Sequence, residues 1–536
     1  MILKIAIGQI NPSVGNFKTN KEKILKYVID SKKLSPDIIV FPELSICGYP
    51  PLDLIWEKNF IKENSNSLNE IASISNIPII IGCIRSQGNN FYNSAAVCFN
   101  GKVQTYCDKM LLPTYDVFDE KRYFSSGEKP KVVLVPINGE YKKIGVQICE
   151  DLWDDDYPCK VSDIQKDLGA NLIINISASP YYENRKKERK DYIIHKTGQI
   201  KLPFIYCNMV GAQDELIFDG SSCAFTKEGK LIAQCKSFEE DLIMVNLEED
   251  KKIKFSMYNR EEEIYRALCL GVNDYFIKTG HSKAAVGLSG GIDSALVATI
   301  AAEALGKENV CGISLPSKFS SQHSLTDAKE LATNLGIDYR VIKTHTIIKS
   351  FEATLKDSFK DKKPNVAEEN IQSRVRGNIL MAFANKFGWL VLSTGNKTEL
   401  ALGYCTLYGD MVGALSVISD LSKNDVYSIS KWINKNRQNC IPLNSIDKPP
   451  SAELAPNQVD PFDYSIVSPL IDEIIEKRKS IPQLINKGYS EDLVYDVYKK
   501  IKINEYKRRQ APPGLRVSSK AFGVGRRLPI VNNFNG

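Results

Sequence analysis

Residues 284–294 read Ala284-Ala285-Val286-Gly287-Leu288-Ser289-Gly290-Gly291-Ile292-Asp293-Ser294. The residues up to Leu288 form a short apolar run typical of a buried strand, and the residues from Ser294 to Leu305 predict a helix. The two glycines between them let the backbone approach an anion closely, and the free N–H groups at a helix N-terminus attract phosphate. The spacing fits neither GxGxxG nor GxxxxGKS/T, which argues against a dinucleotide fingerprint or a Walker loop. On these residues alone, a phosphate-binding loop and a plain strand-to-helix turn capped by Ser and Asp are both open.

The rest of the second half alternates strands and helices. Strands are predicted at residues 310–315, 339–342 and 389–393, and helices at residues 324–335 and 371–387. This alternation is typical of a doubly wound parallel sheet, whose ligands bind at the carboxyl ends of the strands. We therefore expect a Rossmann-like α/β domain in the second half of the chain.

The first half is richer in short β runs. Strands are predicted at residues 4–9, 38–41, 79–83, 94–99, 143–149, 172–177, 204–208 and 222–226. Asn100-Gly101 and Glu228-Gly229 suit hairpin turns, while polar helical stretches separate other strands. Hairpins combined with helices indicate sheets covered by helices, an α/β layered sandwich. A charged, strand-poor stretch predicts a linker at residues 248–263 between domains at residues 1–247 and 264–536, the second opening on a helix at Ile264.

Composition limits the class of protein. The 536 residues are 43% hydrophobic and 25% charged, and they are enough for two domains of about 250 residues each. The net charge of +6, from 70 basic and 64 acidic residues, is too small to suggest nucleic-acid binding. The 13 cysteines include no CxxC pair, and we expect a cytoplasmic, reducing location. No export signal and no apolar run of about 18 residues is visible, so no membrane partner is expected.

The loop of the second half carries a family resemblance. Residues 289–294 match the SGGxDS loop of ATP pyrophosphatases at every fixed position, and residues 393–399 and 403–410 look like those of NAD synthetases. The resemblance implies cleavage of ATP between its α and β phosphates, with an adenylate forming on a substrate carboxylate. It implies an ATP site made of Gly287, Leu288, Ser289, Gly290, Gly291, Ile292, Asp293, Ser294, Thr394, Lys423 and Ser451.

The same resemblance implies a second substrate and a metal. It places Asn370, Glu399 and Lys507 against deamido-NAD, and Asp293 and Glu399 against Mg²⁺. From the residues alone, an oxygen-only pair of carboxylates suits Mg²⁺ bridging phosphates, while a solvated surface carboxylate is the alternative for Glu399.

Three segments of the first half could form a second site. Glu43, Lys109 and Cys149 each stand at the end of a strand run, so they could converge at one sheet edge. There Glu43 would act as general base and Cys149 as nucleophile, with the Lys109 cation stabilising thiolate and oxyanion. Their order, Glu then Lys then Cys, resembles the nitrilase or carbon–nitrogen hydrolase superfamily. That resemblance implies a nitrilase-type α-β-β-α sandwich.

Residues 43–53 and 112–120 resemble the glutaminase domain of glutamine-dependent NAD synthetases. By this match Tyr115, Ser179 and Arg185 would hold glutamine, with Arg185 pairing with its α-carboxylate. The two resemblances together imply ATP-dependent synthesis of NAD from deamido-NAD, using ammonia from glutamine and releasing AMP and pyrophosphate. They also imply a homo-oligomer formed through the synthetase domain.

Two other classes of function remain open from the sequence. One is a plain amidase whose second half senses a nucleotide, against which the intact Thr394, Glu399 and Lys507 argue. The other is an ATP pyrophosphatase that modifies nucleic acid, against which the small net charge argues.

Overall fold

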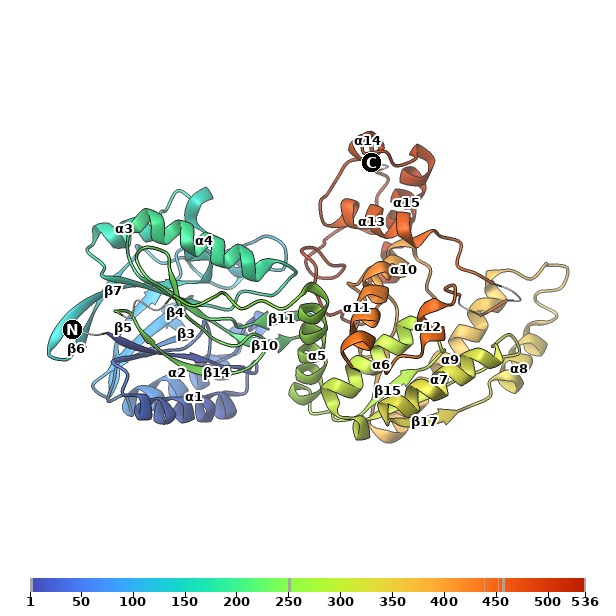
Figure 1. Cartoon of the computed structure of the whole chain (residues 1–536), viewed down its shortest axis with the longest axis horizontal. Helices are drawn as coiled ribbons and strands as arrows, with labels where there is room; N and C mark the ends of the chain where they lie inside the picture. The colour runs from blue at the N-terminus through green and yellow to red at the C-terminus, as the bar shows by residue number, and fades with distance from the viewer. Residues whose placement is uncertain (1–2, 249–251, 438, 452, 456–457, 535–536) are drawn as a thin grey trace. The chain divides into compact units, whose positions relative to one another are not determined.

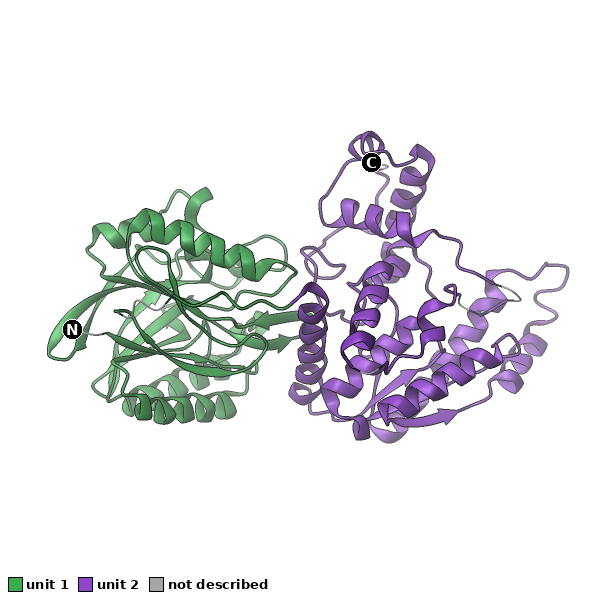
Figure 2. Ribbon diagram, viewed as in Figure 1, with its two compact units in different colours: residues 1–258 green, residues 259–536 purple. Residues whose placement is uncertain are grey.

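The computed structural model of the chain describes residues 3–248, 252–437, 439–451, 453–455 and 458–534. It divides into two compact units, Met1–Tyr258 and Asn259–Gly536 (Figure 2). Helix α5 (Arg260–Lys278) begins inside the predicted linker, before the expected start at Ile264. The earlier start follows from its cap, because the Asn259 side chain accepts the N–H of Glu262 and three glutamates place negative charge in the first turn.

Unit 1 is built on two six-stranded sheets. The first has the order β14-β1-β2-β3-β4-β5, with bounds Asp241–Asn246, Lys4–Gln9, Ile38–Val40, Ile79–Gln87, Asn90–Phe99 and Lys102–Asp108. The second has the order β13-β12-β9-β8-β7-β6, with bounds Leu231–Gln234, Cys223–Phe225, Phe204–Asn208, Leu172–Ser177, Glu140–Ile148 and Val132–Ile137. A separate hairpin joins β10 (Val210–Gln213) and β11 (Leu216–Asp219).

Helices cover the outer faces of both sheets (Figure 1). These are α1 (Phe17–Ser31) and α2 (Lys58–Ser73) on the first sheet, and α3 (Val161–Asp167) and α4 (Arg185–Ile200) on the second. Side chains alternate accordingly along β1, where Ile5 and Ile7 pack between the sheets and Ala6 packs under the helices. The expected α-β-β-α sandwich is confirmed.

Strands that were not predicted complete the sheets. The turn at Asn100 and Gly101, both at positive φ, joins β4 to β5 as a hairpin, as its sequence indicates. However, β5 itself is rich in polar residues, and β6 contains Pro136, which an edge strand tolerates. The polar composition of β5 hides it from a search for apolar runs, whereas β6 is apolar and is obscured only by its proline.

Unit 2 has a five-stranded sheet of order β17-β16-β15-β18-β19, in which every neighbouring pair is parallel. The strands are β15 (Ala284–Gly287), β16 (Val310–Ser314), β17 (Asp338–Val341), β18 (Leu390–Ser393) and β19 (Leu415–Ser416). This confirms the doubly wound parallel sheet. The strand order reverses between β15 and β18, and ligands of such folds bind at this switch point.

The helices of unit 2 besides α5 are α6 (Ile292–Leu305), α7 (Gln322–Leu335), α8 (His345–Leu355), α9 (Val366–Phe387), α10 (Lys397–Leu402), α11 (Lys423–Asn436), α12 (Leu443–Asp447), α13 (Tyr464–Ile475), α14 (Ile481–Asn486), α15 (Glu491–Ile503) and α16 (Glu505–Arg508). Helices α13, α14 and α15 pack with α10 in an apolar cluster apart from the sheet (Figure 1). No helix in the described ranges combines the length and the apolar character needed to cross a bilayer.

Helix α9 differs from its prediction. It begins at Val366 rather than Ile371, because Asn365 and Glu368 form a capping box. Asn370 therefore lies within the helix, not before it.

Gly82 of β3 is packed against the segment that carries Glu43. A Cβ at Gly82 would lie 2.2 Å from the backbone nitrogen of Leu44. Gly198, on the exposed side of α4, would place a Cβ in open space. We predict that Gly82→Ala lowers the free energy of unfolding of unit 1 by about 1–3 kcal/mol through overpacking. The matched Gly198→Ala change should instead raise it by about 0.5–1 kcal/mol, since alanine favours a helix. Denaturant titrations measure both, and equal stability of the two variants would contradict the packing at β3.

Candidate active sites

Unit 1 brings Glu43, Lys109 and Cys149 together. Glu43 follows β2 and Lys109 directly follows β5, both in the first sheet, whereas Cys149 directly follows β7 in the second. The three residues therefore meet across two packed sheets, and the expected convergence at a single sheet edge is wrong. All three are buried, and Lys109 Nζ lies 2.8 Å from Glu43 Oε1. The charges of Glu43 and Lys109 both act on the Cys149 thiol.

Lys109 lies between two carboxylates. Its ammonium donates to Glu43 Oε1 and to Glu120 Oε1, each at 2.8 Å, and the Tyr49 hydroxyl donates to the same Glu120 oxygen at 3.0 Å. Burial opposes the charged form of Lys109, but Glu120 and Glu43 outweigh it and hold the pKa of Lys109 well above its ordinary value. The site therefore contains a permanent cation.

Glu43 is held by two further donors. The Asn93 side chain donates to Oε1 at 2.7 Å, and the Ala178 backbone N–H donates to Oε2 at 2.7 Å. The carboxylate is fixed in position by three elements of unit 1. Nothing in the local sequence around Asn93 distinguishes it from an ordinary strand residue.

Cys149 occupies a sharp turn at φ 45°, where a short 3-10 helix (Cys149–Leu152) follows β7. Asp151 anchors this turn by accepting the N–H groups of Ile148 at 3.0 Å, Met110 at 3.0 Å and Leu111 at 2.9 Å. The anchor ties the turn to the residues that follow Lys109. Burial raises the pKa of the Cys149 thiol and Glu43 raises it further, with Lys109 opposing both, and the net shift favours the neutral thiol.

The three residues expected to bind glutamine lie around this turn. The Tyr115 hydroxyl donates to Glu150, the neighbour of Cys149, at 3.0 Å. Ser179 follows β8, and its buried hydroxyl has no hydrogen-bond partner within the described part of the chain. Arg185 is the first residue of α4, with its guanidinium carbon 4.2 Å from the centre of the Trp153 ring. The charge of Arg185 acts on Tyr115, which places the two in one region.

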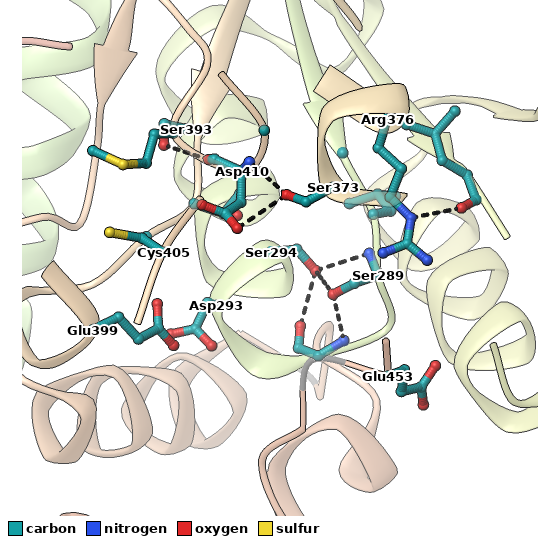
Figure 3. A pocket seen from close by; sticks show the side chains of 18 of the residues that line it. Ser289, Asp293, Ser294, Ser373, Arg376, Ser393, Glu399, Cys405, Asp410 and Glu453 are labelled. Atoms are coloured by element: carbon teal, nitrogen blue, oxygen red, sulfur yellow. Dashed lines mark hydrogen bonds between the residues drawn. The ribbon is translucent and has the colours of Figure 1, made fainter. Parts of the chain in front are cut away.

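Unit 2 contains a cavity of about 310 Å³ at the carboxyl ends of β15, β16 and β18 (Figure 3). Most of the predicted ATP residues line it: Gly287, Leu288, Ser289, Gly291, Ile292, Asp293, Ser294, Thr394, Lys423 and Ser451. Glu399 lines it as well, whereas Gly290, Asn370 and Lys507 are not among the lining residues.

The glycine-rich loop has a fixed shape. Gly290 has φ 81°, and a Cβ there would lie 2.3 Å from the Ser324 carbonyl oxygen, so glycine is required. Ser289 Oγ accepts the Gly291 N–H at 3.1 Å, and Ser294 Oγ donates to the Gly291 carbonyl at 3.0 Å (Figure 3). Helix α6 begins at Ile292, earlier than the predicted Ser294, which puts Asp293 in its first turn.

Two carboxylates and one lysine meet beside the loop. Lys423 Nζ donates to Asp293 Oδ2 and to Glu399 Oε1, and Asn396 Nδ2 donates to Asp293 Oδ1 at 2.9 Å. Figure 3 shows the Asp293 and Glu399 carboxylates turned toward one another. Burial raises the pKa of Glu399, Lys423 lowers it and Asp293 raises it. In the absence of a metal ion this shift favours the protonated form of Glu399, and the two carboxyl groups together offer the oxygen ligands that suit a divalent cation.

Asn370 and Lys507 hold one wall of the cavity instead of lining it. Asn370 Oδ1 accepts the Thr406 hydroxyl at 2.7 Å. Lys507 Nζ donates to the carbonyls of Gly403 and Cys405, each at 2.8 Å. Both contacts fix the segment 403–406, whose residues Tyr404 and Cys405 face the cavity.

The cavity also contains charged residues that the sequence analysis did not assign. They are Arg376, Asp410, Lys448, Glu453 and Asp460. Arg376 donates through Nε to the Leu315 carbonyl at 3.0 Å, and Asp410 accepts the Ser373 hydroxyl at 3.1 Å. Asp410 stands in the segment 403–410 that carries the family resemblance, and this resemblance is the sequence signal that could have identified it. The side chains of this charged group alone match no metal or nucleophile pattern.

Comparisons with known proteins agree with this arrangement. Residues 264–511 match the NAD synthase family, and residues 4–251 match the carbon-nitrogen hydrolase family. A glutamine-dependent NAD(+) synthetase from Synechocystis sp. is 43% identical to this chain, and one from Thermotoga maritima is 41% identical, each alignment covering 99% of both chains.

A solved structure of glutamine-dependent NAD+ synthetase from Acinetobacter baumannii, in complex with ADP, superposes with a TM-score of 0.80 at 36% identity over 99% of both chains. A second one, from Cytophaga hutchinsonii, superposes with a TM-score of 0.86 at 22% identity and supports the fold. The chain therefore belongs to the glutamine-dependent NAD(+) synthetase family, as an enzyme that joins a carbon-nitrogen hydrolase unit to an NAD synthase unit.

Proposed function

We propose that this enzyme makes NAD from deamido-NAD and ATP, with ammonia that unit 1 releases from glutamine. One observation carries the proposal: each unit has its own complete set of reactive groups. Unit 1 has a buried Glu43–Lys109 pair beside Cys149, and unit 2 has a glycine-rich loop opening into a cavity.

In unit 1, Glu43 takes the proton of the Cys149 thiol as the sulfur attacks the amide carbon of glutamine. The Lys109 cation stabilises the negative oxygen that develops. Glu43 returns the proton to the nitrogen, the C–N bond breaks, and ammonia departs while the acyl group stays on Cys149 as a thioester. Glu43 then takes a proton from water as the water oxygen attacks the thioester carbon. The C–S bond breaks, Glu43 returns the proton to the sulfur, and glutamate is released.

Glutamine is held by the residues around the turn. Arg185 offers a guanidinium to the α-carboxylate, and the Ser179 hydroxyl retains its hydrogen-bonding capacity for the substrate. Tyr115, whose hydroxyl donates to Glu150 beside the nucleophile, completes the proposed glutamine site.

In unit 2, the loop from Ser289 to Ser294 and the N-terminus of α6 receive the ATP phosphates, with Thr394, Lys423 and Ser451 at the same cavity. A carboxylate oxygen of deamido-NAD attacks the α-phosphorus, and pyrophosphate leaves. Ammonia then attacks the carbonyl carbon of the adenylate, and AMP leaves. Asp293 and Glu399 would hold Mg²⁺, which neutralises phosphate charge when bound. We place deamido-NAD against Glu399 and against segment 403–406 of the cavity wall. Asn370 and Lys507 hold that segment in position through their hydrogen bonds.

Identification of the products tests the proposal as a whole. With ATP, glutamine and deamido-NAD present, AMP, pyrophosphate, glutamate and NAD should form in equal amounts. ADP and orthophosphate would contradict adenylation. Glutamate and ammonia without AMP would instead indicate an amidase whose second unit only senses a nucleotide.

The two sites should be separable by mutation. We predict that Cys149→Ala lowers the glutaminase rate on the order of 10⁴-fold, because the nucleophile is lost. The same variant should make NAD from ammonium salts, and better at alkaline pH where more NH₃ is present. Asp293→Asn should weaken synthesis from both nitrogen donors while leaving a functional glutaminase site. A folded Cys149→Ala enzyme that still uses glutamine near the original rate would contradict the assignment of the nucleophile.

The raised pKa of Cys149 gives a separate prediction for the enzyme without substrate. Burial and the Glu43 charge favour the neutral thiol, so the thiolate fraction grows as pH increases. Alkylation of Cys149 by iodoacetamide, followed by peptide mass spectrometry, should be slow at neutral pH and still increase above about pH 9. Glu43→Gln removes one charge that raises this pKa, so the increase should move to lower pH. A rate that is constant from neutral pH upward would show a resting thiolate paired with Lys109.

A further inference from the structure

Arg185 is placed to bind a carboxylate, but its hydrogen bonds do not fix its orientation. Its Nη1 atom donates to the Tyr182 hydroxyl at 3.3 Å and to Glu188 Oε2 at 3.4 Å, and both bonds are long. Within the described ranges, Nε and Nη2 of Arg185 donate no hydrogen bond. The guanidinium thus retains donors for a ligand, and another contact must hold its plane.

That contact is the indole ring of Trp153. The Arg185 guanidinium carbon lies 4.2 Å from the centre of this ring, and the Tyr192 ring stacks on Trp153 with centroids 4.4 Å apart and an angle of 29°. Arg185 and Tyr192 are seven residues apart on α4, which corresponds to about 10 Å along a helix axis. Trp153 therefore contacts α4 at both of these positions. A guanidinium that lies over an aromatic ring keeps its N–H edge available for a carboxylate.

Trp153 also belongs to the segment that carries the nucleophile. It directly follows the short helix Cys149–Leu152, and its N–H donates to the Glu150 carbonyl at 2.8 Å. Asp151 anchors the same turn through three backbone N–H groups. The indole therefore connects the position of the Cys149 thiol to that of the Arg185 guanidinium.

We infer that Trp153 is a positioning residue that makes the hydrolase unit select amides bearing an α-carboxylate. It holds the plane of Arg185 at a set distance from Cys149, so a substrate whose carboxylate pairs with Arg185 presents its amide carbon to the sulfur. Trp153 itself touches no reacting atom. This inference rests on the proposed glutaminase activity and adds to it the origin of substrate selection.

A matched pair of variants tests the role of the ring. Trp153→Phe keeps an aromatic face, while Trp153→Leu keeps a smaller apolar side chain without one. Each is assayed on the whole enzyme with glutamine and with 4-aminobutanamide, which retains the amide and the amino group but lacks the α-carboxylate. Tyr141→Ala, an exposed aromatic change at the start of β7, serves as the control.

We predict that Trp153→Leu raises KM for glutamine about tenfold or more, with a smaller change in kcat, because the Arg185 plane is no longer held. Hydrolysis of 4-aminobutanamide should stay within about threefold of the parent enzyme, since it makes no use of Arg185. Trp153→Phe should restore most of the preference for glutamine.

Equal losses on both amides would show a merely structural role for Trp153 and overturn the inference, as would an unchanged KM for glutamine in Trp153→Leu. If the parent enzyme itself failed to hydrolyse glutamine, the proposed glutaminase activity would be wrong, which is a different result from either of these.

Discussion

Both sites depend on one constraint, that strands running in the same direction end at the same edge of a sheet. In unit 1, β2 of the first sheet leads to Glu43, and the parallel strands β7 and β8 of the second sheet lead to Cys149 and Ser179, so the site forms where these ends of the two packed sheets meet. Strand β5 pairs antiparallel with β4, which pairs antiparallel with β3, so β5 runs in the direction of β2 and delivers Lys109 to the same edge. In unit 2, the same rule places the loop after β15 beside the residues that follow β18.

Each site also contains a buried lysine that contacts two carboxylates. In unit 1, Lys109 lies between Glu43 and Glu120. The N–H groups of Asn93 and Ala178 also donate to the Glu43 carboxylate. In unit 2, Lys423 contacts Asp293 and Glu399, and the pKa of Glu399 remains raised. The first cluster suits a reaction in which a proton moves to and from Glu43. The second places two acidic side chains beside one lysine, and oxygen ligands of this kind suit binding of a cation with the phosphates of ATP.

The sequence predicts the architecture well where apolar runs alternate, and it locates the segments of both sites. Strands β1, β8 and β9 have the predicted bounds because they are apolar throughout or nearly so. Strand β5 was missed because it is polar and gains its stability from neighbours in the sheet, whereas β6 and β14 were missed although they are mainly apolar. The starts of α5, α6 and α9 were placed too late, because their first turns are polar or glycine-capped and lie outside the apolar pattern.

Contacts between distant residues were beyond a reading of the sequence. Asn93 on Glu43, and Trp153 on Arg185, are contacts across the fold with no local signature. The resemblance places Asn370 and Lys507 against deamido-NAD. Only the structure shows that their side chains bind segment 403–406.

The central claim is that ammonia from one unit replaces an adenylated carboxylate oxygen in the other. Deamido-NAD labelled with ¹⁸O in its nicotinate carboxylate tests this most directly, with glutamine labelled with ¹⁵N in its side-chain amide. The account predicts NAD containing ¹⁵N and AMP containing one ¹⁸O atom, because the attacking carboxylate oxygen leaves with the α-phosphate. Unlabelled AMP with ¹⁸O in pyrophosphate or orthophosphate would contradict the account.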